Sequence, residues 1–267
     1  MRKVLLVAAT ALLPLAASAH MTWLMPNATV VTNRDGSVSI DAAVSEDLFI
    51  FERALKLEDL RITGPAGAKL EAKNRLAAKN HESFDLDLPG NGTYRISNVG
   101  TSLMGAYKVG TETKRFRATA DTLAKELPAD AEVLSLARTV ARQQTFVSRE
   151  EAGDAKFTPE GDGLELLPLT QVTDLSTGDS SRVRLLLDGK PLANTDVTLR
   201  PGGNRYRYKT GEITLKTDAQ GELTIKWTEA GQWWLGANYG DRRAQGGTRE
   251  KPLERAALSV TFEVLPK

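Results

Sequence analysis

The fold class of this chain is decided by one stretch, Phe84-Asp85-Leu86-Asp87-Leu88, which Pro89-Gly90-Asn91-Gly92 follows directly. Its hydrophobic residues recur at every second position, which is the period of a β-strand with one buried face. The proline, the asparagine and the two glycines favour a tight reversal of the chain. The same alternation recurs in short segments such as Val38/Ile40 and Leu48/Ile50. Short alternating strands separated by turns are typical of an antiparallel β-sandwich.

The rest of the chain extends this pattern. Strands are expected at 182–187 and 258–264, and residues 133–147 favour a strand because they are rich in β-branched side chains. One short helix is expected at 121–127, where Pro128 ends it.

The sequence therefore predicts an all-β protein with little helix, built from two immunoglobulin-like or transthyretin-like β-sandwich domains. The expected domains are residues 20–150 and 164–267. Residues 151–163 combine charged residues with glycines and a proline, and are predicted to form a linker.

Composition excludes several classes of function. The 35 lysines and arginines are nearly balanced by 34 aspartates and glutamates, so a phosphate-binding nucleic-acid partner is not expected. The chain has no cysteine, which rules out disulfides, thiolate metal sites and thiol catalysis. It also lacks a G-x-S-x-G elbow, a Walker loop and a G-x-G-x-x-G loop, and no catalytic residue is predicted.

The first nineteen residues have the layout of a secretory signal peptide. Arg2 and Lys3 precede a hydrophobic run, and Ala17-Ser18-Ala19 matches a cleavage site. The hydrophobic run is shorter than the roughly 20 residues that span a bilayer, so no membrane anchor is expected. The sequence predicts cleavage after Ala19 and a periplasmic protein that begins at His20.

The two histidines, His20 and His81, are the strongest candidates for metal ligands. A cleaved chain would offer the α-amine and the imidazole of His20 to one metal ion. His81 would supply a third nitrogen, which completes the arrangement known as a histidine brace. Nitrogen donors bind Cu(II) more strongly than Ni(II) and Co(II), and metal supply often decides between them. The competing interpretation is that both histidines are solvent-exposed and have no ligand role.

Neighbouring side chains add weaker candidates. Glu82 and Asp85 flank His81 and are predicted to supply an oxygen ligand or to orient the imidazole, unless they only form a solvated strand face. Three methionines are either thioether ligands or ordinary core residues, namely Met21, Met25 and Met104.

A basic, aromatic segment is a candidate partner-binding loop. Arg205, Tyr206, Arg207 and Tyr208 alternate cations with aromatic rings directly after a glycine-rich turn. Such a loop suits an anionic partner, and the alternative is a solvated hairpin with cross-strand tyrosine packing.

Several motifs resemble a known family. These are His20-Met21-Thr22-Trp23-Leu24-Met25-Pro26, Gly163-Leu164-Glu165-Leu166-Leu167-Pro168 and Leu187-Asp188-Gly189-Lys190-Pro191-Leu192, with Thr217-Asp218, Gly221, Gly231 and Trp233 further along. They resemble an exported family of unknown function that is often labelled a periplasmic component of nickel or cobalt uptake. The C-terminal turns also resemble carboxypeptidase-regulatory or transthyretin-like sandwich modules. The resemblance implies two β-sandwich regions and a role with a divalent metal.

The expected function is therefore the binding of nickel, cobalt or copper for uptake or delivery, without catalysis. The partners would be the metal ion and a metal transporter or outer-membrane receptor. Two other functions stay open: a copper oxidoreductase that uses the same histidine brace, and a module that binds proteins or glycans without a metal.

Overall fold

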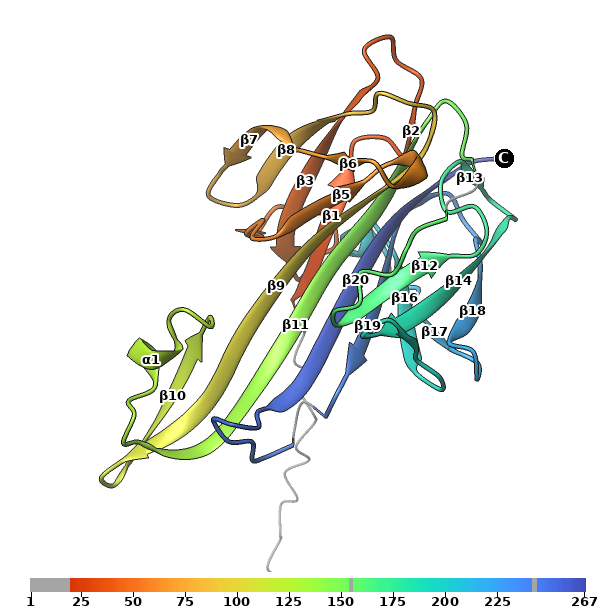
Figure 1. Ribbon diagram of the computed structural model, residues 1–267. Coiled ribbons are helices and arrows are strands. Elements are labelled where there is room, and N and C mark those ends of the chain that lie inside the picture. The colour runs from red at the N-terminus through yellow and green to blue at the C-terminus, as the bar shows by residue number, and fades with distance from the viewer. Residues whose placement is uncertain (1–19, 154–155, 242–243) are drawn as a thin grey trace, which may run out of the picture.

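The computed structural model describes residues 20–153, 156–241 and 244–267, and most of them lie in strands of three sheets (Figure 1). This confirms the predicted all-β sandwich. The predicted signal peptide lies outside the described residues. Within those ranges, no helix has the length and hydrophobicity needed to cross a bilayer.

The first sheet has five antiparallel strands, and their hydrophobic residues alternate as the sequence predicts. Its path is β1 (Met21–Pro26), β3 (Ser37–Ser45), β8 (Glu82–Asp87) and β7 (Lys73–Ala77), while β4 (Arg53–Ala54) also pairs with β3. Phe84, Leu86 and Leu88 are buried, whereas the residues between them are partly or fully exposed.

The second sheet has eleven strands and runs through both halves of the chain. Its path is β17 (Ile213–Lys216), β16 (Asp196–Pro201), β19 (Gly231–Tyr239), β20 (Leu253–Leu265), β11 (Glu132–Arg149), β9 (Gly92–Val109), β5 (Leu60–Thr63) and β6 (Lys69–Leu70). Three strands pair beside this path: β10 (Glu112–Ala118), β13 (Leu175–Ser176) and β2 (Val30–Val31). The two halves join where β11 pairs with β20 in parallel.

The third sheet covers the C-terminal half of the large one. It contains β12 (Leu164–Pro168), β14 (Ser180–Leu187), β15 (Lys190–Pro191) and β18 (Glu222–Lys226). Helical structure among the described residues is limited to α1 (Leu123–Glu126) and two 3-10 turns, η1 (Pro65–Gly67) and η2 (Asn204–Tyr206). The predicted short helix and the strand over 133–147 are thus both confirmed.

Each half of the large sheet has its own hydrophobic core. Leu24, Ile40, Phe84 and Ile96 belong to the core beneath the five-stranded sheet. The core beneath the third sheet is made almost entirely by residues after 163, including three that are nearly inaccessible: Trp227, Trp233 and Phe262.

A long arm extends beyond both cores. Figure 1 shows the far ends of β9 and β11 continuing with β10 and α1, away from the third sheet. A small cluster that includes Leu103, Phe116, Leu127 and Leu136 packs on one face of this arm.

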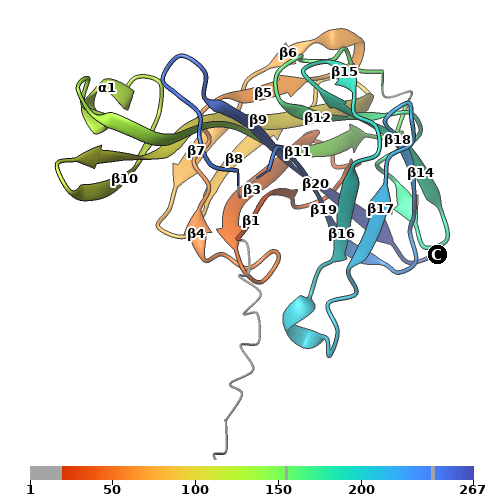
Figure 2. The same ribbon diagram turned by 90° about the horizontal axis from the view of Figure 1, so that it is seen from below.

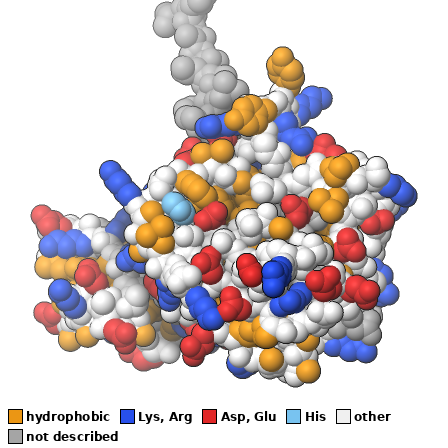
Figure 3. Space-filling view, turned by 90° about the horizontal axis from the view of Figure 1, so that it is seen from above, with side chains coloured by type: hydrophobic (Ala, Val, Ile, Leu, Met, Phe, Trp, Pro, Cys, Tyr) orange, Lys and Arg blue, Asp and Glu red, His pale blue; other side chains and the backbone are white. Residues whose placement is uncertain are grey.

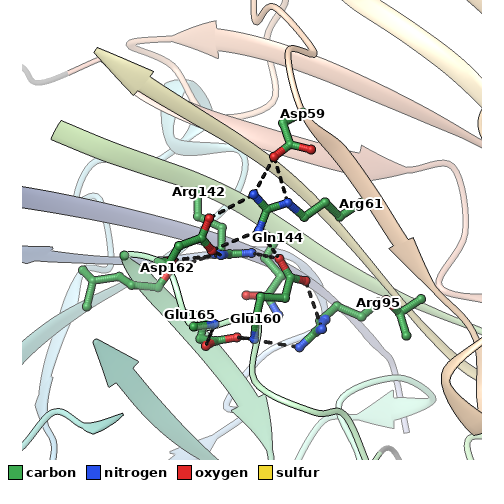
Figure 4. A network of polar contacts seen from close by, with 12 residues as sticks. Asp59, Arg61, Arg95, Arg142, Gln144, Glu160, Asp162 and Glu165 are labelled. Carbon is green, nitrogen blue, oxygen red and sulfur yellow. Dashed lines mark hydrogen bonds and ion pairs between the residues drawn. The ribbon is translucent and has the colours of Figure 1, made fainter. Parts of the chain in front are cut away.

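The described end of the predicted linker, residues 156–163, is held by a buried group of charged side chains (Figure 4). The carboxylate of Glu160 lies 2.5 Å from Arg142 Nη1, 2.9 Å from Arg95 Nη2 and 3.1 Å from Arg61 Nη1. Glu165 accepts hydrogen bonds from the backbone amides of Glu160 and of the glycine after it, at 2.9 and 3.1 Å. The segment is therefore fixed against β5, β9 and β11.

The acids of this cluster are held ionised by the arginines. Burial raises the pKa of Glu160, but the charges and hydrogen bonds of Arg142, Arg95 and Arg61 together outweigh burial and bring this pKa below its ordinary value. Burial likewise opposes ionisation of Asp162, and a hydrogen bond from Arg61 together with the charge of Arg142 lowers its pKa. Each charge is thus stabilised by a close opposite charge.

Side chains of β11 also bind the backbone of β12. Arg142 Nε donates to Leu164 O at 2.9 Å. The side-chain amide of Gln144 donates to Leu166 O at 2.9 Å and accepts from Leu166 N at 3.2 Å. β12 is an edge strand, so the backbone groups on its free side have no neighbouring strand of the third sheet. Because buried backbone groups need partners, the two side chains of β11 supply these hydrogen bonds.

Candidate functional site

The start of β1 is anchored where the two halves of the large sheet meet. β1 packs across β11 and β20, and Figure 2 shows it lying beside them near the centre of the molecule. Trp234 Nε1 donates to Thr22 O at 3.0 Å, and Thr261 Oγ1 donates to Leu24 O. The Thr22 hydroxyl also lies 3.3 Å from Ser259 Oγ. Residue 20, which precedes β1, is therefore attached to a rigid element.

His20 faces a carboxylate on the neighbouring strand. The register pairs Met21 with Ser45, so the next pair along brings His20 opposite Glu46. His20 Nε2 lies 3.3 Å from Glu46 Oε1, and both side chains are about half exposed. A carboxylate only accepts hydrogen bonds, so Nε2 carries the proton and the lone pair of a neutral ring is on Nδ1. Nδ1 is the ring nitrogen nearer the backbone.

The loop after β3 places further acidic groups near His20. Glu52 accepts hydrogen bonds from the backbone amides of Glu46 and Asp47 at 3.0 and 3.2 Å. These two bonds lower the pKa of Glu52, and the charge of His20 contributes a smaller effect in the same direction. Asp47 in turn pairs with Arg205 at 3.3 Å, which connects this loop to η2.

His81 lies in a stack of aromatic rings. Its ring is 4.3 Å from that of Phe51 at an angle of 8°, and Phe51 stacks on the buried Trp23 at 5.7 Å. His81 Nδ1 lies 3.1 Å from Asn80 Oδ1. Figure 3 shows hydrophobic side chains gathered around a histidine on the surface, with an acidic side chain beside it.

The two histidines flank β3 on opposite sides. His20 precedes β1 and His81 precedes β8, and β3 pairs with both strands. β1 and β8 are therefore two strand spacings apart, which is about 10 Å across the sheet. His81 shares the face of Trp23 through Phe51, whereas alternation along β1 gives His20 the opposite face. Among the described residues, no three His, Cys, Asp or Glu side chains form a group that could hold a metal ion.

Asp41 carries no signal in the sequence that marks it as a site residue. The register places it between Met25 of β1 and Ser83 of β8, on the face that carries Trp23. Burial raises the pKa of Asp41, and the charge of His81 partly opposes this shift. A polar residue in an alternating strand is expected to be exposed, so only the tertiary structure reveals this half-buried carboxylate.

The two acids expected to support His81 have other partners. Asp85 accepts hydrogen bonds from Ser39 Oγ at 2.6 Å and Asn74 Nδ2 at 2.9 Å, and these bonds lower its pKa. Glu82 accepts from the backbone amide of Leu57 at 3.3 Å. Both carboxylates therefore contribute to the local structure of the five-stranded sheet.

The candidate partner-binding loop is only partly free. Arg205 pairs with Asp47, and Arg207 pairs with Glu229 at 2.8 Å. Tyr206 and Tyr208, in contrast, are almost fully exposed.

The methionines divide between a core and the arm. Met21 and Met25 are buried with Trp23 in a small hydrophobic cluster, while Met104 is 48% exposed on the arm.

Comparisons with known proteins give a family without an assigned activity. A family model described as a domain of unknown function, DUF4198, matches residues 17–241. No curated protein matches the chain.

Solved structures resemble the chain only distantly. The D0-D1 domain of intimin has 14% identity over 92% of this chain and 100% of that one, with a TM-score of 0.22. The human OSCAR ligand-binding domain has 15% identity over 90% and 97%, with a TM-score of 0.19. TM-scores this low support no conclusion about the function of this chain. The family match, by contrast, covers most of the sequence, and the chain therefore belongs to the DUF4198 family of domains of unknown function.

Proposed function

We propose that this protein is exported to the periplasm, where it binds a divalent transition metal, nickel, cobalt or copper, for uptake or delivery. The metal is cargo, and its main ligands are the α-amine and the Nδ1 atom of His20 after cleavage at Ala19. The observation that supports this proposal is the contact between His20 Nε2 and Glu46, at 3.3 Å. A carboxylate that binds one ring nitrogen orients the other toward a metal and increases its basicity.

The chemistry of the donor set fits these ions. An α-amine with an ordinary pKa near 8 and an imidazole with one near 6.5 can both bind a metal at neutral pH. Glu52 and Glu46 add negative charge beside the ring. The anchored backbone of β1 keeps the chelating residue in place.

His81 has a secondary part in this proposal. It lies across β3 from His20, so it is the candidate for a separate, weaker site together with Asp41. A histidine brace formed with His20 would require β1 and β8 to rearrange.

Isothermal titration with Ni²⁺ and Cu²⁺ tests the proposal on chains that differ at the first residue. A chain that begins at His20 should bind both ions. A chain that retains Ala19 should bind them at least about 100-fold more weakly, because the backbone nitrogen of His20 is then part of a peptide bond. Glu46→Gln should weaken binding by about 10- to 100-fold.

Two variants serve as controls. Glu112→Gln removes the same charge from an exposed position on the arm and should leave affinity unchanged. His81→Ala should affect only a second, weaker phase. Equal affinity of the chains with and without Ala19 would show that the amine is not a ligand and would refute the proposal.

The delivery partner, a transporter or receptor, is proposed to contact Tyr206 and Tyr208. Asp47 joins this loop to the segment that carries Glu46, so a protein bound there would lie beside the metal. Replacing both tyrosines with serine should weaken capture of the partner and leave metal affinity unchanged.

A further inference from the structure

A cavity on the arm takes no part in the proposed function. It has a volume of about 480 Å³ and opens on β9, β10, β11 and β20, with residues 244–246 along one side. We propose that this cavity binds a small organic anion, a carboxylate attached to a short hydrophobic body.

The floor of the cavity is apolar and preformed. The register brings Met104 beside Ala137 and Ala106 beside Ser135, so their side chains share one face of the sheet. The other face of the same strands packs in the core that contains Leu103. Because that core supports the strands from behind, the floor does not need to form when a ligand binds.

Two hydrophobic side chains at this site lack a covering element. Met104 is 48% exposed and Leu134 is 40% exposed, and both line the cavity. They would contact the carbon chain of a ligand, which would remove their apolar surface from water and so favour binding.

The charged residues that line the cavity are basic. They are Arg115 and Arg255, and no aspartate or glutamate lines it within the described parts of the chain. Arg255 Nη2 donates to Ala244 O at 3.2 Å, while its Nε is inaccessible to solvent and lacks a hydrogen-bond partner. The side chain of Arg115 has no hydrogen bond or ion pair with the residues that the structure describes. Two guanidinium groups without acidic partners are suited to a carboxylate, which accepts two parallel hydrogen bonds from one arginine.

The loop at the side of the cavity is fixed in place. Leu136 N donates to Gly246 O at 2.9 Å, which attaches the loop to β11. The next residue, Gly247, has a φ of 81°, and a Cβ there would lie 2.0 Å from Leu136 O. Only glycine permits this approach, so Gly247 allows the loop to pack closely against β11 and form one wall of the cavity.

The size of the cavity selects the size of the ligand. Sites for small molecules usually measure about 300–1,000 Å³, so this one accommodates a carboxylate with a body of several carbons. An inorganic ion would leave Met104 and Leu134 in contact with water, whereas a carbon chain would cover them. The observations therefore favour an aliphatic carboxylate over phosphate.

The test uses hexanoate as the probe and ¹³C-methyl methionine NMR as the readout. The chain that begins at His20 has three methionines. Met104 lines the cavity, while Met21 and Met25 belong to β1 and pack in a separate hydrophobic cluster. Hexanoate should shift the Met104 resonance in a saturable manner and leave the Met25 resonance unchanged. Arg115→Gln and Arg255→Gln should each weaken binding by about ten-fold or more.

Matched controls separate this proposal from general charge effects. Lys114→Gln removes one positive charge from the neighbouring residue, whose side chain lies on the opposite face of β10, and should leave hexanoate binding unchanged. The Met25 resonance reports that each variant has folded. A chain that retains Ala19 should bind hexanoate normally although it loses metal affinity, so the two proposals fail independently.

Three results would overturn the proposal. Hexanoate could fail to shift Met104 up to its solubility limit, 1-hexanol could bind as tightly as hexanoate, or Lys114→Gln could weaken binding as much as Arg115→Gln. The first would remove the site, the second would remove the requirement for an anion, and the third would remove the specific role of Arg115.

Discussion

Glu160→Gln tests how much the buried charged cluster contributes to the stability of the protein. Glu160 lies 2.5, 2.9 and 3.1 Å from three arginines, and its side chain is only 9% exposed. Glutamine has nearly the same shape but no charge, so the arginines Arg61, Arg95 and Arg142 would lose their shared carboxylate. Removing one partner of a buried ion pair costs about 3–5 kcal/mol, and we expect a loss of that size in the free energy of unfolding.

Urea unfolding followed by tryptophan fluorescence measures this loss, because Trp23, Trp227 and Trp233 are buried in the cores. The matched control is Glu254→Gln, which breaks the exposed pair with Arg138 at 3.0 Å and should cost about 0–1 kcal/mol. If the two variants unfold within 1 kcal/mol of one another, the cluster contributes no more than a surface ion pair, and the reasoning is refuted.

The same cluster predicts a dependence on pH. The pKa of Glu160 in the folded protein lies below its ordinary value of 4.5. Its stabilising contribution is therefore complete above that value and is lost as the pH falls through the folded pKa, because the unfolded chain takes up the proton first. The stability difference between the wild-type protein and Glu160→Gln should accordingly shrink below pH 4.5. A constant difference down to acidic pH would contradict this assignment.

Three further variants test local features. Tyr94→Phe removes the hydroxyl that donates to Gly90 O at 2.6 Å and accepts from Gly90 N at 2.9 Å, and calorimetry should show a loss of about 1–3 kcal/mol. Trp234→Phe keeps an aromatic side chain but removes the indole N–H that donates to Thr22 O, so amide exchange at the start of β1 should become faster and Ni²⁺ affinity should fall. Unchanged exchange would show that this bond does not anchor β1. Gly247→Ala forces a Cβ against the backbone of β11 at a φ of 81°, and urea unfolding should show a loss of at least about 1 kcal/mol.

Much of the fold could be predicted because alternation is a local property. The buried Phe84, Leu86 and Leu88 follow directly from their spacing, as does the long strand over 133–147. The parallel pairing of β11 with β20 could not be predicted, because residues more than a hundred positions apart form it and no local pattern encodes it.

The candidate site divides in the same way. The sequence by itself predicts a cleavage site before His20 and shows that His81 precedes an alternating segment, since both depend only on neighbouring residues. The tertiary structure alone decided that His20 faces Glu46, that His81 stacks on Phe51, and that Asp41 of β3 is half-buried between Met25 and Ser83. The charged cluster around Glu160 and the cavity beside Arg115 were also decided by the tertiary structure alone. Side-chain environment depends on which strands become neighbours, and that is settled by the packing of the whole chain and not by any one segment.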